Sequence, residues 1–174
     1  MIKYKENPFY LTDEQVKWVE DSYASMTKEE KIGQLFCPIV FTKDEQELKD
    51  LVNNSHIGGM LYREGPGEEL RQAHKVLQDN SKIPLLTASN LEYGGNGSAV
   101  EGTYFGREML VAATGDTEKA YQLGKVSCSE GAAVGVNMPV RCKQMVQPAV
   151  FGVEGFLAAV SQPVVSTSAG SAGL

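Results

Sequence analysis

Short apolar runs alternate with segments of helical periodicity in the first half of the sequence, and this alternation limits the fold more than any other feature. Strands are predicted at residues 35–41, 57–62 and 83–88, with helices between them at 44–53 and 67–79. Parallel strands need crossover connections, usually helices, so strand–helix–strand repeats indicate βαβ units. The strands are apolar almost throughout, as expected for a parallel sheet buried on both faces. The predicted fold class is therefore α/β, either a barrel or an open doubly wound sheet.

Three further helices have clear start signals. Thr12 and Thr27 are each followed three residues later by a Gln or Glu, which is the pattern of a capping box. The helix after Thr12 is predicted to run to about residue 24 and to pack through one apolar face. A long helix is predicted over residues 116–134, capped by an Asp and ended by Gly135. The apolar stripes of the two helices between the strands are Leu48, Leu51 and Val52 in the first, and Leu70, Ala73, His74 and Leu77 in the second.

The charge balance argues against some partners. The sequence has a net charge of -6 at pH 7, with 42% hydrophobic and 22% charged residues. Nucleic-acid binding depends on clustered Lys and Arg that neutralise phosphates, so this acidic chain is not expected to bind nucleic acid. No stretch approaches the roughly 18 apolar residues of a membrane helix, and residues 1–10 contain no apolar run typical of a signal peptide. We therefore expect a cytoplasmic protein with no membrane segment.

The cysteines and histidines show no pattern of a metal site. Cys37, Cys128 and Cys142 are odd in number and lack the spacing of metal ligands, so we expect reduced thiols, no disulfide and no metal or other cofactor. Cys37 is expected to be buried as a small apolar side chain. His56 and His74 are expected to be packing residues and not catalysts.

The glycine-rich segment after the third predicted strand is the candidate binding site. In parallel α/β folds, functional residues lie on loops that leave the carboxyl ends of the strands. Residues 90–97 read Asn-Leu-Glu-Tyr-Gly-Gly-Asn-Gly, in which Asn90, Glu92 and Asn96 can form hydrogen bonds with ligand hydroxyls. The alternative is a flexible turn between two elements. A phosphate loop is not indicated, because neither Gly-Lys-Ser/Thr nor the glycine spacing of a dinucleotide fingerprint is present.

Seven segments resemble glycoside hydrolase family 3, in the family's order along the chain. Residues 26–36 read Met-Thr-Lys-Glu-Glu-Lys-Ile-Gly-Gln-Leu-Phe and are similar to the helix with which members of the family begin. The other segments are residues 57–60, 82–86, 90–94, 102–105, 112–116 and 132–137. Together they span about residues 18–137. The resemblance implies the N-terminal part of a (β/α)8 TIM barrel, in which parallel strands alternate with helices, and it places residues 90–94 in the family's substrate loop.

The sequence departs from the family pattern at three places. Asn90 stands where the family most often has Asp. Asn keeps the shape of Asp and one acceptor oxygen but lacks the negative charge. Tyr93 replaces a glycine of the same loop. After Asn137 the family's Phe-Ala-Pro-Val-x-Asp pattern is missing, and residues 138–174 contain only three charged residues. We therefore divide the chain into a barrel-like unit, residues 1–137, and a divergent, weakly structured tail, residues 138–174.

No catalytic residue is assigned in this chain. Glycoside cleavage needs two groups that flank the bond, and in retaining enzymes they are carboxyls about 5–5.5 Å apart. The resemblance implies an Asp nucleophile on a late strand. It implies as acid/base either a His-Asp pair on a mid-barrel loop or a Glu of a second domain. None of these motifs follows Asn137. We therefore expect a truncated, frame-shifted or degenerate gene product that is inactive alone.

Three functional hypotheses remain open from the sequence. The first is a fragment of a glycosidase that hydrolyses terminal β-linked glucose or N-acetylglucosamine, whose partners are a small carbohydrate and the missing barrel half. The second is a carbohydrate-binding α/β module that uses the Asn90 loop without chemistry. The third is an unrelated open α/β domain that binds a phosphate-bearing ligand, and the order of the matching segments disfavours it.

Overall fold

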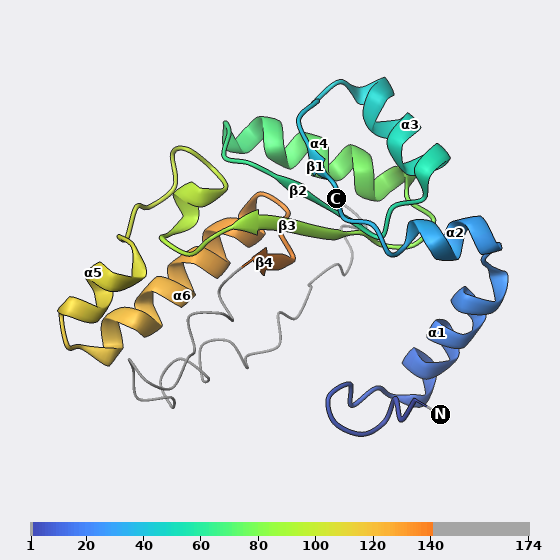
Figure 1. Cartoon of the computed structure of the whole chain (residues 1–174), viewed down its shortest axis with the longest axis horizontal. Helices are drawn as coiled ribbons and strands as arrows, with labels where there is room; N and C mark the ends of the chain where they lie inside the picture. The colour runs from blue at the N-terminus through green and yellow to red at the C-terminus, as the bar shows by residue number, and fades with distance from the viewer. Residues whose placement is uncertain (1, 141–174) are drawn as a thin grey trace, which may run out of the picture.

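Four parallel strands form one sheet in the computed structural model, which describes residues 2–140 (Figure 1). The strands are β1 (Ile39–Val40), β2 (Gly59–Tyr62), β3 (Leu86–Asn90) and β4 (Met138–Val140), and they lie in the order β1-β2-β3-β4. All three pairings are parallel, which confirms the predicted α/β class. A doubly wound sheet reverses its strand order at a switch point, whereas a barrel adds each strand beside the last. The unreversed order is that of a partial (β/α) barrel.

Two helices cover one face of the sheet. α3 (Glu45–Ser55) and α4 (Gly67–Asn80) pack against each other and against β1 and β2 (Figure 1). The predicted stripes are confirmed, with only Leu51 partly exposed. The buried cluster consists of Val40, Leu48, Val52, Ile57, Met60, Tyr62, Leu70, Ala73, Leu77 and Leu85. On the opposite face, Ile39 and Leu86 are exposed, and this is the face that points inward in a closed barrel.

A long helix, α6 (Thr117–Ala133), forms part of the crossover from β3 to β4. Its N-cap is Asp116, whose carboxylate accepts a hydrogen bond from the Glu118 N–H at 2.9 Å, so the predicted helix is confirmed. Beyond the helix, Asn137 ties β4 to β3. Its side-chain oxygen accepts from the Thr87 N–H at 2.8 Å, and its amide nitrogen donates to the Leu85 carbonyl at 2.9 Å.

The two N-terminal helices begin at the predicted capping boxes. α1 (Asp13–Ser25) follows Thr12 and α2 (Lys28–Gly33) follows Thr27, and both threonine hydroxyls accept from the N–H three residues on. α2 packs closely through Gly33, which lies against the backbone of the end of α3. α1 contains no buried residue and projects away from the sheet, so the predicted packing of one of its faces is wrong for the residues that the structure describes (Figure 1).

Several expectations need correction. The strand predicted at residues 35–41 is confined to β1, because Leu35 and Phe36 form the turn that closes α2, and Leu35 is 83% exposed. Cys37, which follows this turn, is exposed and not buried. The short helix α5 (Glu108–Ala113) was not predicted. Its six residues are too few for a helical stripe to stand out.

The predicted boundary after Asn137 falls inside the sheet. Met138–Val140, the first residues after it, form β4, which pairs with the last three residues of β3. The rest of the predicted tail, residues 141–174, lies outside the described residues. Within residues 2–140, no helix is long and apolar enough to cross a membrane.

Candidate functional site

The segment that leaves the carboxyl end of β3, residues 91–106, is called here the β3 loop. It includes a single 3-10 turn, η1 (Gly95–Gly97), and then folds back on itself. The backbone of Gly94 pairs antiparallel with Tyr104, and the Tyr93 carbonyl accepts from the Phe105 N–H at 2.8 Å. The loop is therefore a folded unit and not the flexible turn that was the alternative expectation.

The β3 loop is fastened on one side to the segment between β2 and α4. The Gly65 N–H donates to the Ser98 carbonyl, and the Gly65 carbonyl accepts from the Val100 N–H, both at 3.0 Å. Farther along, the Glu101 carboxylate accepts from the Gly67 N–H at 2.9 Å, at the first residue of α4. The unpaired N–H groups and the dipole of a helix N-terminus favour a carboxylate there. The loop thus spans the carboxyl ends of two neighbouring strands.

On its other side the loop is held by one carboxylate of α6. Glu130 accepts from the Thr103 N–H at 2.7 Å and from the Thr103 hydroxyl at 2.6 Å. The contact needs a glycine at position 95, because a Cβ on Gly95 would overlap the Glu130 carboxylate. Hydrogen bonds to a charged acceptor are about twice as strong as neutral ones. Glu130 therefore fixes the far half of the loop against the helix.

A close backbone approach shapes the near half of the loop. Gly97 lies directly against Asn90, so that a Cβ at position 97 would overlap the Asn90 carbonyl oxygen. The hydroxyl of Ser89 donates to the Gly97 carbonyl at 3.1 Å. The chain consequently turns back over the end of β3, and residues 90–97 stay together at this edge of the sheet.

The three predicted binding residues all lie at this edge. Asn90 is the last residue of β3 and is half-buried. Glu92 is only 8% exposed, and its Oε2 is buried without a hydrogen-bond partner among the described residues. Asn96 lies in η1, and its Oδ1 is also buried and without a partner in the same part of the chain. Buried polar atoms are nearly always paired, so two unpaired acceptors in one short loop point to an absent donor.

Two tyrosines of the β3 loop and the arginine that follows it contact one another and were not predicted as site residues. The ring centroids of Tyr93 and Tyr104 are 6.1 Å apart, and the Arg107 guanidinium lies 5.5 Å from the centroid of the Tyr93 ring. Partial burial raises the pKa of Tyr93, as do the negative charges of Glu64 and Glu92. The phenol therefore stays protonated at neutral pH. Tyr93 could have been singled out from the sequence because it replaces a glycine of the family. Tyr104 and Arg107 gave no such signal.

Comparison with known proteins decides the family. The sequence profile of the glycosyl hydrolase family 3 N-terminal domain matches residues 27–140. The chain belongs to glycosyl hydrolase family 3. One relative, a beta-N-acetylglucosaminidase/beta-glucosidase from Cellulomonas fimi, is 36% identical over 137 residues, which are 79% of this chain and 24% of the relative.

Solved structures of family 3 relatives share the fold. A beta-glucoside phosphorylase bound to 2FGlc is 40% identical with a TM-score of 0.72, over 79% of this chain and 26% of that one. A family 3 beta-N-acetylglucosaminidase from Paenibacillus sp. str. FPU-7 is 25% identical with a TM-score of 0.58, over 66% of this chain and 24% of that one. The chain therefore spans about a quarter of the length of these relatives, and its sheet is part of a family 3 barrel.

The histidines of this family 3 domain lie outside the β3 loop. His74 is buried in α4, where its Nδ1 is 2.6 Å from the Val134 carbonyl and its ring packs against Tyr62. Because a carbonyl only accepts, Nδ1 carries the proton, and burial lowers the pKa of the ring. His56 forms the left-handed C-cap of α3, and its carbonyl accepts from the Gln34 side chain. His74 thus has a packing role, as expected, and His56 ends α3 through its backbone.

Proposed function

We propose that this chain forms the sugar-binding first part of a family 3 glycosidase barrel that acts on terminal β-linked glucose or N-acetylglucosamine. In this proposal Asn90, Glu92 and Asn96 bind hydroxyl groups of the sugar. The printed names of the relatives support these two sugars, since one relative is a beta-N-acetylglucosaminidase/beta-glucosidase and another a beta-glucoside phosphorylase. The position of the loop at the carboxyl end of β3 supports the site, because barrel enzymes bind substrates there.

The observation that carries the proposal is the pair of buried oxygens, Glu92 Oε2 and Asn96 Oδ1, that have no hydrogen-bond partner within residues 2–140. Leaving a buried acceptor without a donor destabilises a protein by about 1–3 kcal/mol. Sugar hydroxyls are donors, and a pyranose carries several of them on one edge. A bound sugar would therefore satisfy both oxygens at once.

The chemical step is proposed to need groups beyond this chain. A retaining reaction requires a second carboxyl on the opposite side of the sugar from the first. The family resemblance implies that these groups come from later strands or a second domain. Positioning of reacting groups contributes about 7–11 kcal/mol in favourable cases, so one carboxylate at the end of β3 falls far short. We expect the 174-residue chain to bind sugar and not to turn it over.

Calorimetric titration of the full chain with glucose and with N-acetylglucosamine tests the binding. Glu92→Gln replaces one acceptor oxygen by a donor, so we expect the affinity to fall by about 10- to 100-fold. The control is Glu14→Gln on α1, which removes the same charge from an exposed site remote from the loop. Binding that survives Glu92→Gln unchanged would contradict the assignment of this residue.

An activity assay on the same preparations tests the second half of the proposal. We expect neither nitrophenyl β-glucoside nor nitrophenyl β-N-acetylglucosaminide to be hydrolysed above background. Turnover that persists through purification and disappears in Glu92→Gln would instead make Glu92 a catalytic residue of a complete active site.

A further inference from the structure

We propose that Glu130 of α6 and Thr103 of the β3 loop are a pair of positioning residues, which hold Asn96 where its side chain binds a sugar hydroxyl. The inference rests on the proposed function, because it concerns the sugar site at Glu92 and Asn96. It adds that the affinity for sugar depends on two residues that do not contact the sugar, and that this dependence acts through Asn96 and not through Glu92.

Glu130 binds both hydrogen-bond donors of one loop residue. Its Oε2 accepts from the Thr103 N–H at 2.7 Å, and its Oε1 accepts from the Thr103 hydroxyl at 2.6 Å. Two bonds to one carboxylate fix the orientation of Thr103 as well as its position, and bonds to a charged acceptor are stronger than bonds between neutral groups. Thr103 is thus held by α6 in one orientation.

Thr103 in turn contacts the turn that carries Asn96. Its carbonyl accepts from the Asn96 N–H at 3.4 Å and lies so close to Gly94 that a Cβ there would overlap the carbonyl oxygen. The Glu130 carboxylate itself lies against Gly95, the first residue of η1. Contacts of the folded chain therefore connect Glu130 with Asn96 through Thr103 and through Gly95.

Glu92 is supported in a different way. Leu91, the residue before it, is 1% exposed and belongs to the apolar cluster that includes Val134 and Val136. Glu92 also lies only two residues after the end of β3. The strand and the apolar cluster therefore set the position of Glu92, so we expect this position not to depend on Thr103.

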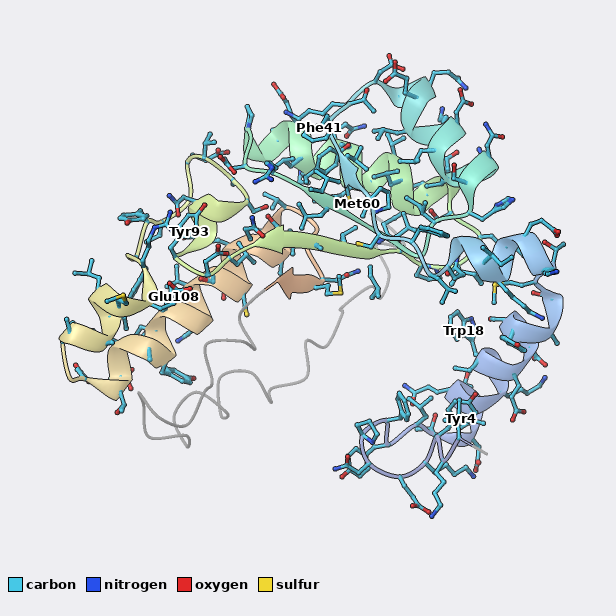
Figure 2. The ribbon with its side chains drawn as sticks, viewed as in Figure 1. Tyr4, Trp18, Phe41, Met60, Tyr93 and Glu108 are labelled. Atoms are coloured by element: carbon cyan, nitrogen blue, oxygen red, sulfur yellow. The ribbon has the colours of Figure 1, made fainter. Side chains whose placement is uncertain are left out.

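The pair acts on a buried oxygen from the surface of the molecule. The β3 loop lies between β3 and α5, where Figure 2 labels Tyr93, and η1 packs against α6. Thr103 is exposed, whereas Asn96 Oδ1 is buried and has no hydrogen-bond partner in the described part of the chain. Hydrogen bonds weaken steeply when their geometry is poor, so a buried acceptor needs exact placement to meet a sugar hydroxyl. Support from α6 supplies that placement.

Calorimetric titration of the full chain with glucose tests the pair. Thr103→Val removes the hydroxyl and keeps the shape of the side chain, so we expect the Kd for glucose to rise about three- to tenfold. Thr103→Ser keeps the hydroxyl and should bind glucose like the wild type. Glu130→Gln removes the charge of the acceptor and should raise the Kd by a similar factor. The control is Thr117→Val, at an exposed threonine of α6 whose hydroxyl forms no hydrogen bond within residues 2–140.

A double-mutant cycle distinguishes the positioning of Asn96 from a general loosening of the loop. If the pair acts through Asn96, its effect disappears with that side chain, so Thr103→Val should not weaken binding further in an Asn96→Ala background. In a Glu92→Gln background, Thr103→Val should weaken binding by its full factor. Equal weakening in both backgrounds is the result of a general loss of loop structure, and it would overturn the inference.

The outcomes separate this inference from the proposed function. If Asn96→Ala weakens glucose binding and Thr103→Val leaves it unchanged, the positioning role fails and the proposed function stands. The positioning role also fails if Thr103→Ser binds as weakly as Thr103→Val. If the wild type binds neither glucose nor N-acetylglucosamine, the proposed function fails and the positioning role fails with it.

A measurement on the unmutated chain covers the case in which the variants fail to fold. Coupling is reciprocal, so if the pair strengthens sugar binding, bound sugar also strengthens the pair. Hydrogen exchange of the Thr103 amide should therefore slow about three- to tenfold at saturating glucose. The matched amide is that of Gly67, which donates to the other loop carboxylate, Glu101, and should slow less. Equal slowing of the two amides, or no slowing of Thr103, would contradict the proposal.

Discussion

Two neighbouring regions of the molecule are stabilised by different forces. One is the layer formed by α3, α4, β1 and β2, and the other is the β3 loop. The layer has one continuous cluster of buried apolar side chains, to which both helices and two strands contribute. The loop contributes to two smaller apolar clusters, through Leu91 and Ala99 in one and Phe105 in the other. It is otherwise fastened by hydrogen bonds to Glu130, to the Gly67 N–H and to the backbone of Gly65. Buried polar atoms without a hydrogen-bond partner among residues 2–140 occur in both regions: His74 Nε2 in α4, and Glu92 Oε2 and Asn96 Oδ1 in the loop.

The layer therefore contributes mainly to the stability of the fold, and the β3 loop to the proposed sugar binding. Apolar burial contributes roughly 25 cal/mol per Å² and does not depend on direction, so the layer provides a stable base. Hydrogen bonds are directional, so those of the loop hold a specific shape. Unpaired polar groups are tolerated where a ligand satisfies them. The comparison therefore predicts that substitutions in the layer alter unfolding, and that substitutions in the loop alter sugar binding as well.

The largest effect is expected from a truncation in the layer. Leu70 is completely buried in α4, so Leu70→Ala should lower the free energy of unfolding by about 2–5 kcal/mol through lost burial and the cavity that remains. Urea denaturation followed by circular dichroism measures this change. The matched control is Leu110→Ala on α5, where the side chain is 61% exposed and the loss should stay below about 1 kcal/mol. Equal losses would contradict the account that apolar burial in the layer is what stabilises the fold.

An added methyl group tests the close packing of the β3 loop. Gly97→Ala should push the loop away from the Asn90 carbonyl and lower the free energy of unfolding by about 1–3 kcal/mol. Sugar binding should fall with it, because residues 90–96 would no longer keep their arrangement. Gly65→Ala is the control, since its Cβ would be close to the flexible end of Lys43 at 3.2 Å and in ordinary contact with Leu70 at 3.8 Å. Full sugar affinity in Gly97→Ala would show that the loop shape does not matter.

The smallest effect concerns the two capping boxes, Thr12 with Gln15 and Thr27 with Glu30, which lie in different surroundings. Thr27→Ala should lower the free energy of unfolding by about 1 kcal/mol, because α2 packs through Gly33 against the end of α3. Thr12→Ala should leave global unfolding within experimental error, since α1 has no buried residue and its cap stabilises only that helix. Two equal losses in urea denaturation would mean that α1 is part of the cooperative unit.

The sequence predicted the layer better than the loop for a physical reason. Apolar stripes and capping boxes are local, so the helices containing Leu48 and Leu70 could be recognised from spacing alone. The sequence does not show whether Leu35 continues the strand β1 or closes the helix α2, because an apolar residue is expected in either case. The strand β4 was not predicted because its three residues gave no periodicity.

The candidate site was found only in part. Asn90, Glu92 and Asn96 follow a predicted strand directly, and position at a strand end was enough to select them. The pairing of Tyr104 with Gly94 and the hydrogen bond of Thr103 with Glu130 join residues that are 10 or more positions apart. No local sequence pattern predicts such contacts. What fixes the loop is thus tertiary hydrogen bonding, and it becomes visible only when the chain is folded.

Mapping of NMR chemical-shift changes tests the central claim, that the β3 loop is the sugar-binding element of this family 3 domain. The full chain, labelled with ¹⁵N, is titrated with glucose and with N-acetylglucosamine, and the backbone amide signals are followed. The account predicts that the largest changes fall in residues 90–106 and that the amides of α3 and α4 do not move. Changes concentrated in α3 and α4, or no change at saturating sugar in a folded sample, would contradict it.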